Sequence, residues 1–414
     1  MNIRNFLDSS YTAYHATENV RTMLDEAGFV KLNLGDNWNV ERGGRYYVTR
    51  NGSSVVAFSV GENNVFNLCV SHTDSPSFKV KGGKLVESEG VKRLNTEKYG
   101  GALMYSYLDR QLKIAGRVLV ETEAGVEQQL VVSDYNVVIP SLAIHHNPTA
   151  NDSLALNAQI DTLPLFTQGE TKLYESLAEG KVLDADLYVV PASSSFESGA
   201  NDEFLCGARL DNLTSVYTSI KAIINAEPQD IAVVACLDNE EIGSSTRQGA
   251  PSFVHQVLDA ISDALDMTRA ETLNATENGM ALSVDNGHAV HPAHPEKSDP
   301  INHCQLNGGI VIKHHVNYAT DGLTSAVLKR MLNEIDVSYQ DYYNKSDLRS
   351  GSTLGLATAR ELGMKVCDIG IAQLAMHSAC ETCGTLDIEA MEKCLTTFLD
   401  TKLSCTDNEV KFDL

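Results

Sequence analysis

Residues 231–243 read IAVVACLDNEEIG, an apolar run that ends in two adjacent glutamates. The apolar part, 231–236, is typical of a buried strand. Glu240 and Glu241 follow it, and each carboxylate costs several kcal/mol to desolvate unless a cation or hydrogen bonds compensate it. Taken alone, residues 238–241 are typical of a solvated turn with a charged pair. The rest of the chain favours a site that supplies the missing positive charge.

The composition is that of a globular protein with an acidic balance. The chain has 414 residues, enough for two domains, and 43% of them are hydrophobic and 21% charged. A net charge of -23 argues against nucleic acid or an anionic membrane surface as a main partner. The first residues lack an apolar core typical of a signal peptide, and no run approaches about 18 apolar residues. We therefore expect a soluble cytoplasmic protein.

The nine cysteines are scattered along the chain. An odd number in a long chain fits reduced thiols in a cytosol better than a disulfide framework. Cys380 and Cys383 form a C-x-x-C pair, but neither a second pair nor a thioredoxin-like context accompanies it. A structural zinc or redox role for this pair is therefore the less favoured interpretation.

Strand-like and helix-like segments alternate in most of the chain. Residues 45–49 and 54–60 are rich in β-formers, and Asn51-Gly52 between them is a good hairpin signal. Further apolar runs predict strands at 66–70, 231–236, 280–284, 309–313 and 366–374, and helical periodicity predicts helices at 11–27, 212–226, 252–265, 352–362 and 388–399. This alternation predicts an α/β layered domain with a largely parallel sheet.

Residues 78–200 differ from the segments on either side. Short alternating strands separated by glycine turns predominate there, which is typical of an all-β region. We interpret the region as a β-rich insert within the α/β chain. The expected organisation has three parts, with boundaries at 1–77, 78–203 and 204–414.

Polar side chains follow several of the predicted strands at the point where each strand ends. In open α/β sheets, ligands bind outside the carboxyl ends of the strands, so we expect these side chains to meet at one edge. They are His72, Glu240, Glu241, Asp285 and His377. Asp211 begins a predicted helix, where a simple N-cap is the alternative reading. A set of histidines and carboxylates suits zinc or cobalt, and it is too rich in oxygen for a structural cysteine site.

Five segments, in this order, resemble the aspartyl aminopeptidase and vacuolar aminopeptidase I family of dinuclear zinc exopeptidases. They are His72-Thr73-Asp74-Ser75-Pro76, Gly207-Ala208-Arg209-Leu210-Asp211-Asn212, Asp238-Asn239-Glu240-Glu241-Ile242-Gly243, Ser283-Val284-Asp285 with His288-Ala289-Val290-His291-Pro292, and Met376-His377-Ser378. Residues 46–54 and 142–145 match as well, so the resemblance covers nearly the whole chain. It implies a three-layer catalytic domain formed by 1–77 and 204–414, with a mostly parallel sheet, and a β-rich dimerisation domain at 78–203.

The resemblance also implies two zinc ions per subunit, with cobalt or manganese as possible substitutes. Asp211 would bridge the two ions. His72 and Asp285 would complete the shell of one ion, and Glu241 and His377 would complete the shell of the other. Two metal ions about 3.5–4 Å apart clamp the attacking oxygen and polarise the scissile carbonyl.

Further roles follow from the same resemblance. Glu240 would be the general base that takes the proton of a metal-activated water and passes it to the leaving amine. Asp74 would orient His72, since metal-bound histidines usually need such a partner. His145 matches a histidine that reaches into a neighbouring subunit's active site, which implies a homo-oligomer, a dodecamer built from dimers. Lys313 matches a lysine near the substrate side-chain pocket.

Each of the last two residues has an ordinary alternative. His145 alone could be a surface histidine, and Lys313 alone a solvated strand end. The chain also departs from the family after Lys313, where His314-His315-Val316-Asn317-Tyr318 is about two residues shorter than usual, and at Cys380, where arginine is common. His288, His291 and His294 are spaced like a metal-ligand ladder, but Pro292 and Pro295 break a helical face, so a pocket loop is the favoured reading.

The expected function is a metal-dependent aminopeptidase that hydrolyses the N-terminal residue from peptides. Acidic N-terminal residues are expected substrates if Lys313 pairs with them, and neutral residues stay open. The first alternative is a dinuclear zinc deacylase or carboxypeptidase of the same fold; the order of motifs and the long insert favour the aminopeptidase. The second alternative is a catalytically silent scaffold. Loss of Glu240 or of a metal ligand would indicate such a scaffold, and none of these residues is missing.

Overall fold

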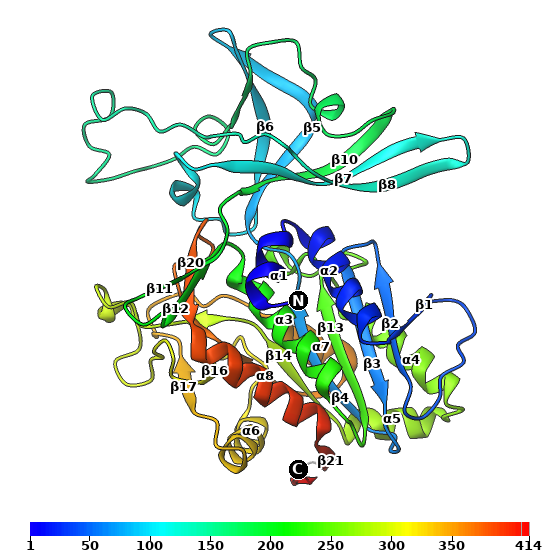
Figure 1. Cartoon of the computed structure of the whole chain (residues 1–414). Helices are drawn as coiled ribbons and strands as arrows, with labels where there is room; N and C mark the ends of the chain where they lie inside the picture. The colour runs from blue at the N-terminus through cyan, green and yellow to red at the C-terminus, as the bar shows by residue number, and fades with distance from the viewer. Residues whose placement is uncertain (407, 414) are drawn as a thin grey trace.

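A nine-stranded sheet forms the centre of the α/β part in the computed structural model, which describes residues 1–406 and 408–413 (Figure 1). Its strands, in spatial order, are β1 (Val30–Leu32), β2 (Arg45–Arg50), β3 (Ser54–Val60), β13 (Ile231–Leu237), β4 (Phe66–His72), β14 (Met280–Val284), β18 (Lys365–Gly370), β16 (Ile310–His314) and β17 (Tyr339–Tyr343). The central strands β13, β4, β14 and β18 are parallel to one another, whereas β3 and β16 run antiparallel to their inner neighbours. The predicted, largely parallel sheet is confirmed.

Strand β13 forms because its seven residues are all apolar and can be buried on both faces. Ala232, Val234 and Cys236 belong to one hydrophobic core, and the residues between them belong to a second core on the other face. This alternation is the period of a strand covered on both sides. The buried residues of β13 therefore divide the α/β part into three layers.

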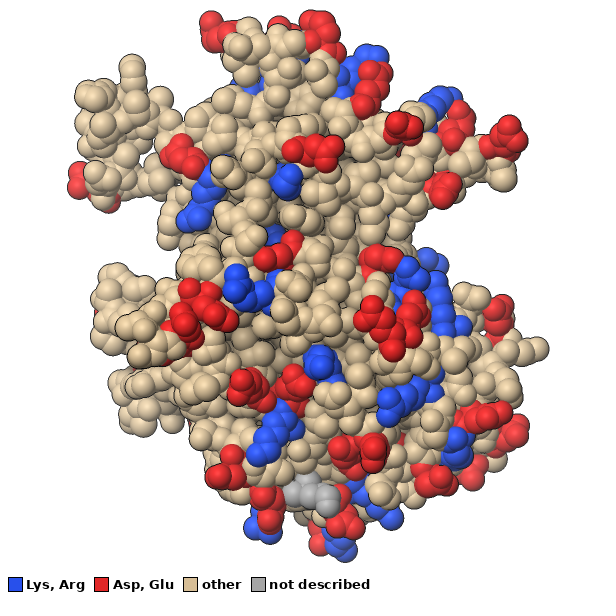
Figure 2. Space-filling model, viewed as in Figure 1, with Lys and Arg blue, Asp and Glu red and all other residues tan. Residues whose placement is uncertain are grey.

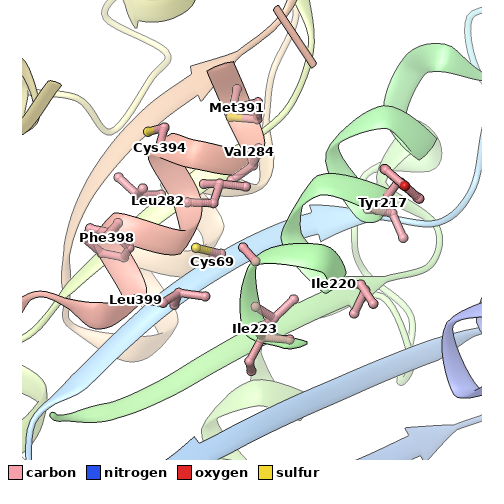
Figure 3. Packing of buried hydrophobic residues seen from close by; sticks show 14 of the residues in the cluster. Cys69, Tyr217, Ile220, Ile223, Leu282, Val284, Met391, Cys394, Phe398 and Leu399 are labelled. Carbon is pink, nitrogen blue, oxygen red and sulfur yellow. The ribbon is translucent and has the colours of Figure 1, made fainter. Parts of the chain in front are cut away.

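Helices cover the two faces of the sheet. The first core packs against α1 (Ile3–Ser9), α2 (Ala13–Glu26), α3 (Leu210–Asn225), α6 (Gly322–Glu334) and α8 (Thr385–Asp400). Figure 3 shows Cys69 of the sheet between side chains of α8, such as Leu399, and of α3, such as Ile223. The second core packs against α4 (Ser252–Ala264), α5 (Arg269–Glu277) and α7 (Leu354–Leu362).

The β-rich region is a separate antiparallel sheet of six strands, which lies above the α/β part in Figure 1. Its spatial order is β8 (Gly125–Val132), β7 (Leu112–Thr122), β10 (Val182–Pro191), β5 (Ser77–Ser88), β6 (Val91–Tyr99) and β9 (Leu165–Thr167). It has a hydrophobic core of its own, centred on residues such as Phe78 and Ile114. The predicted β-rich insert is thus confirmed as a fold element, and we keep 78–203 as the proposed extent of the domain.

A smaller sheet lies beside the central one and carries two segments of the candidate site. It consists of β11 (Phe196–Ser198), β12 (Phe204–Gly207), β20 (Glu381–Gly384), β19 (Ala372–Leu374) and β15 (Gly287–His288). β12 leads directly into the start of α3, and the turn between β19 and β20 carries His377. A two-stranded hairpin, β21 (Lys402–Cys405) and β22 (Val410–Asp413), follows α8.

Two further observations concern the chain as a whole. All nine cysteines have free thiols, and Cys383 of the C-x-x-C pair is buried. Across residues 1–406 and 408–413, none of the helices combines the length and the apolar character needed to cross a membrane.

Candidate metal centre

The side chains expected at one edge of the sheet do meet there. His72 ends β4, Glu240 and Glu241 follow β13 in the short helix η3 (Glu240–Ile242), and Asp285 follows β14. Asp211 comes from the start of α3, and His377 from the turn after β19. All six side chains line one cavity of about 310 Å³. Four of these residues meet because the parallel strands β4, β13 and β14 end at the same edge, and the smaller sheet brings Asp211 and His377 to them.

Asp211 stands between two histidines. Its Oδ1 lies 3.4 Å from His72 Nε2, and its Oδ2 lies 3.4 Å from His377 Nε2. On the first side His72 Nε2 is also 3.5 Å from Asp285 Oδ1, and on the second side His377 Nε2 is 3.2 Å from Glu241 Oε1. The result is two triads of nitrogen and oxygen atoms that share a single carboxylate.

These spacings fit a metal ion in each triad. Ligand atoms at about 2.0–2.1 Å from a tetrahedral zinc ion lie about 3.3–3.4 Å apart, close to the separations in both triads. Asp211 Oδ1 is buried and accepts no hydrogen bond from any described group, so it has an acceptor position for which a cation is a suitable partner. The chemistry of the donors, two imidazoles and three carboxylates, also suits zinc.

The electrostatics of the cavity point the same way. Burial raises the pKa of Glu240 to about 8, and the nearby carboxylates of Asp285 and Glu241 add to this effect. Burial lowers the pKa of the His377 imidazole, but hydrogen bonds to Asp211 and Glu241 outweigh burial and raise this pKa to about 11. Both shifts are those of a buried group of acids that is short of positive charge. Metal cations would supply that charge.

Asp74 lies beside His72, as expected, and makes further contacts as well. His72 Nδ1 lies 3.0 Å from the backbone oxygen of Asp74 and 3.4 Å from its carboxylate. The carboxylate accepts the backbone N–H groups of Glu240 (3.1 Å) and Glu241 (3.2 Å), and the Tyr99 hydroxyl donates to it (2.7 Å). Asp74 therefore contacts both the His72 ring and the turn that carries the two glutamates.

Glu381 is a residue of the site that the sequence analysis missed. Its carboxylate accepts the backbone N–H groups of His377 (2.6 Å) and Asp211 (3.0 Å), so it links the two segments. Burial and the nearby Asp211 raise the pKa of Glu381 to about 8. The sequence offers little signal for it, because Glu381 stands inside the C-x-x-C pair and is brought to Asp211 only by the pairing of β12 with β20.

Lys313 lines the same cavity and is only 3% exposed, so the alternative of a solvated strand end is wrong. Its ammonium group donates to the backbone oxygen of Asn286 (2.7 Å) and lies 3.5 Å from Asp285 Oδ2. His288 and Tyr318 line the cavity beside it. Lys313 is therefore held against a candidate metal ligand.

Other histidines lie away from these triads. His145 is exposed, on the long loop between β8 and β9 of the β-rich sheet. His291 and His294 are exposed, and their rings are tilted relative to each other with centroids 5.3 Å apart. Among residues 1–406 and 408–413, the groups of side chains close enough together to hold a metal ion include none of His288, His291 and His294, which argues against a ladder of three metal ligands.

A layered α/β fold with two adjoining histidine–carboxylate triads at the carboxyl edge of its sheet is the arrangement of a metal-dependent hydrolase. Residues 6–399 match the model of a family described as aminopeptidase I zinc metalloprotease (M18), and the chain belongs to this family of peptide hydrolases.

Relatives and solved structures agree over almost the full length. A probable M18 family aminopeptidase 2 of Pseudomonas savastanoi is 37% identical, over 95% of this chain and 96% of that protein. A structure of the Ape4 and Nbr1 complex contains a chain with 31% identity and a TM-score of 0.90, over 96% of this chain and 84% of that one. The dodecamer of S. cerevisiae mApe1 has 26% identity and a TM-score of 0.80, over 96% and 95%.

Proposed function

We propose that the chain removes the N-terminal residue from peptides, using two zinc ions held by His72, Asp211, Glu241, Asp285 and His377. The observation that carries this proposal is the position of Asp211, whose two carboxylate oxygens each lie 3.4 Å from a different imidazole. A carboxylate so placed can bridge two ions. Membership of a zinc aminopeptidase family supports both the metal and the reaction.

Glu240 is proposed as the general base. When bound, zinc ions polarise the scissile carbonyl and lower the pKa of an attacking water from about 15.7 toward about 7. The Glu240 carboxylate lines the cavity within 4.8 Å of ligand atoms of His72 and Glu241, near enough to accept a proton from a water between the triads. The same carboxylic acid then returns this proton to the leaving amine. The Asp74 carboxylate accepts the backbone N–H of Glu240 and so keeps Glu240 in place.

A comparison of free and blocked amines tests this function. We expect turnover of glutamyl- and leucyl-p-nitroanilide and no turnover of their N-acetyl forms, because an aminopeptidase requires a free α-amine. A deacylase would instead remove the acetyl group. A carboxypeptidase would release the last residue of an N-acetylated dipeptide, and either result in place of aminopeptidase activity would refute the proposal.

Lys313 is proposed to favour acidic N-terminal residues. An ammonium group has three donors, and the contacts with Asn286 and Asp285 use two of them. Within the described part of the chain the third donor has no hydrogen-bond partner, so it can meet a carboxylate of the substrate in the cavity that Lys313 lines. Burial and then the charge of Lys313 lower the pKa of His288, so Lys313 supplies the positive charge on this side of the cavity.

Lys313→Met is expected to lower the preference for glutamyl over leucyl substrates about tenfold or more, because the charge-assisted contact is lost. The measurement is the ratio of kcat/KM for the two p-nitroanilides, which cancels effects on the metal site common to both substrates. Lys365→Met is the matched control, since Lys365 is also a strand lysine that donates to a backbone carbonyl, in Glu277. An unchanged ratio in Lys313→Met would exclude this role.

We also propose a homo-oligomer, a dodecamer built from dimers, in which His145 reaches a neighbouring subunit's site. The loop that carries His145 exposes Leu142 (64%), Ile144 (48%) and Ile160 (62%), and apolar exposure of this kind is typical of an interaction surface. Only one of residues 140–160, Asp152, is charged. The loop projects from the side of the β-rich sheet in Figure 1, and Figure 2 shows few charged side chains there.

Mixing two inactive variants tests the shared site. In a dimer of Glu240→Gln with His145→Ala, one site lacks both groups and the other keeps both. Random pairing in a co-expressed mixture is then expected to restore about a quarter of wild-type activity, because half of the dimers are mixed and each has one intact site. The mixture is compared with each variant alone, and His146→Ala serves as the neighbouring control. Activity no higher than the sum of the separate variants would contradict a shared site.

A further inference from the structure

The segment Tyr99–Gly101 leaves β6 of the β-rich sheet and enters the metal centre of the other part of the chain. Tyr99 ends β6, and Gly101 lines the cavity with the candidate ligands. The segment contacts two of the segments that carry those ligands. It is thus a direct physical connection between the insert and the site.

Gly101 contacts the ring of His377. The His377 Nδ1 atom lies 3.3 Å from the backbone oxygen of Gly101, on the opposite side of the ring from the Nε2 atom that faces Asp211. A Cβ atom on Gly101 would lie 2.9 Å from Nδ1 and 3.3 Å from Cε1 of this ring. The absence of a side chain therefore lets the backbone approach the imidazole closely enough to accept its N–H.

Two further contacts hold the same loop. The backbone N–H of Leu103 donates to the backbone oxygen of His377 (2.9 Å), and the backbone N–H of Ala379 donates to the Ser106 hydroxyl (2.9 Å). Both Leu103 and Ser106 belong to the segment that follows Gly101. The loop that carries His377 is consequently anchored to the insert at three points.

The other half of the segment reaches the two glutamates. Gly100 has a φ of +65°, and a Cβ atom there would lie 3.0 Å from Cβ of Glu241. The Tyr99 hydroxyl donates to the carboxylate of Asp74, which accepts the N–H groups of Glu240 and Glu241. The Asn239 amide donates to the same hydroxyl (2.9 Å).

We infer that Gly101 is a positioning residue for the metal subsite formed by Asp211, Glu241 and His377, and that the insert controls metal retention there through it. A metal-bound histidine needs an acceptor on its second nitrogen to fix its tautomer and ring orientation, and the Gly101 carbonyl is that acceptor. The subsite of His72 and Asp285 does not depend on this contact. This inference rests on the proposed assignment of two zinc ions.

Gly101→Ala tests the inference with one added methyl group. The φ angle of Gly101 lies outside the left-handed region, so alanine fits the backbone. Among the described residues other than its two chain neighbours, only the imidazole of His377 lies within 4 Å of the new Cβ. Displacing the ring is expected to lower the affinity for one of the two zinc ions about 10- to 100-fold, which is the usual effect of losing such an acceptor. The affinity for the other zinc ion is expected to stay unchanged. Zinc competition with a chromophoric chelator measures both affinities.

Two further readouts separate positioning from damage to the fold. The absorption spectrum of the cobalt-loaded chain reports the ligand geometry and is expected to change for one cobalt only. The melting temperature of the metal-free chain is expected to stay within a few degrees of wild type. Gly169→Ala is the matched control, because Gly169 also lies in the insert outside the left-handed region and its new Cβ would meet nothing closer than 3.6 Å.

The outcomes distinguish this inference from the function on which it rests. If wild type binds fewer than two zinc ions, the metal assignment itself fails. If wild type binds two and Gly101→Ala binds both with unchanged affinity and spectrum, Gly101 has no positioning role. Should Gly101→Ala not fold, Ser106→Ala decides, since it removes one anchor of the His377 loop without adding atoms. If Ser106→Ala binds one zinc ion several-fold more weakly than wild type, the inference is supported. If Ser106→Ala binds both zinc ions with wild-type affinity, the inference is overturned.

Discussion

Replacing Glu240 with glutamine is expected to lower kcat by about 10²- to 10⁴-fold while the chain keeps both zinc ions. The amide has nearly the shape of the carboxylate and preserves the packing, but it cannot accept the proton of the attacking water. Glu240 also needs to be ionised to act as a base. Burial and neighbouring carboxylates raise its pKa to about 8. Metal cations beside it would lower this pKa and so allow the proposed base to be ionised at neutral pH.

The adjacent glutamate provides the matched comparison. Glu241→Gln changes the same functional group one residue away, and it is expected to weaken zinc binding as well as turnover, because Glu241 lies 3.2 Å from His377 Nε2 in the second triad. Zinc content and kcat measured on both variants separate the two roles. A near-normal rate in Glu240→Gln would refute the base assignment. Loss of zinc from Glu240→Gln would instead identify it as a ligand.

Asp211→Asn is expected to remove both zinc ions and to abolish measurable turnover. The Asp211 carboxylate belongs to both triads. Asparagine replaces one of its two oxygens with an NH₂ group that cannot bind a metal, so only one oxygen ligand is left. The loss of the negative charge also weakens the remaining oxygen as a ligand. The loss of zinc should be larger than the loss caused by replacing any other single ligand.

Asp285→Asn is the graded control for this prediction. Of the two triads, Asp285 belongs only to the first, where it lies 3.5 Å from His72 Nε2. Its replacement is therefore expected to weaken the binding of one zinc ion and to leave the binding of the other unchanged. The measurement is zinc per chain after dialysis, with the melting temperature of the metal-free protein as a check of folding. Two tightly bound zinc ions in a folded Asp211→Asn chain would exclude the bridging role.

The sequence predicts the central part of this arrangement because strand periodicity is local. The apolar run before Glu240 is long enough to be buried on both faces, and parallel strands must end at one edge, so His72 and Asp285 can be expected beside the glutamates. The same pattern places His377 after a predicted strand and Asp211 at the start of a predicted helix. The family resemblance adds the assignment of these residues to two metal ions, and membership of the family is confirmed. The layered fold and the β-rich insert are confirmed too.

What the sequence does not predict are contacts made across large separations. Glu381 reaches Asp211 only through the pairing of two short strands, and Gly101 reaches His377 from a different sheet. Asp74 was expected to contact His72, yet its carboxylate also holds the backbone of the glutamate turn. The proposed role of His145 needs a second chain, which no periodicity within one chain can reveal.

The most direct test of the two-zinc centre is an anomalous difference map from crystals of the zinc-loaded protein, measured on both sides of the zinc absorption edge. We expect two peaks, one on each side of Asp211, the first beside His72 and Asp285 and the second beside Glu241 and His377. A protein that is active as an aminopeptidase and shows no zinc peak at either triad would contradict the account.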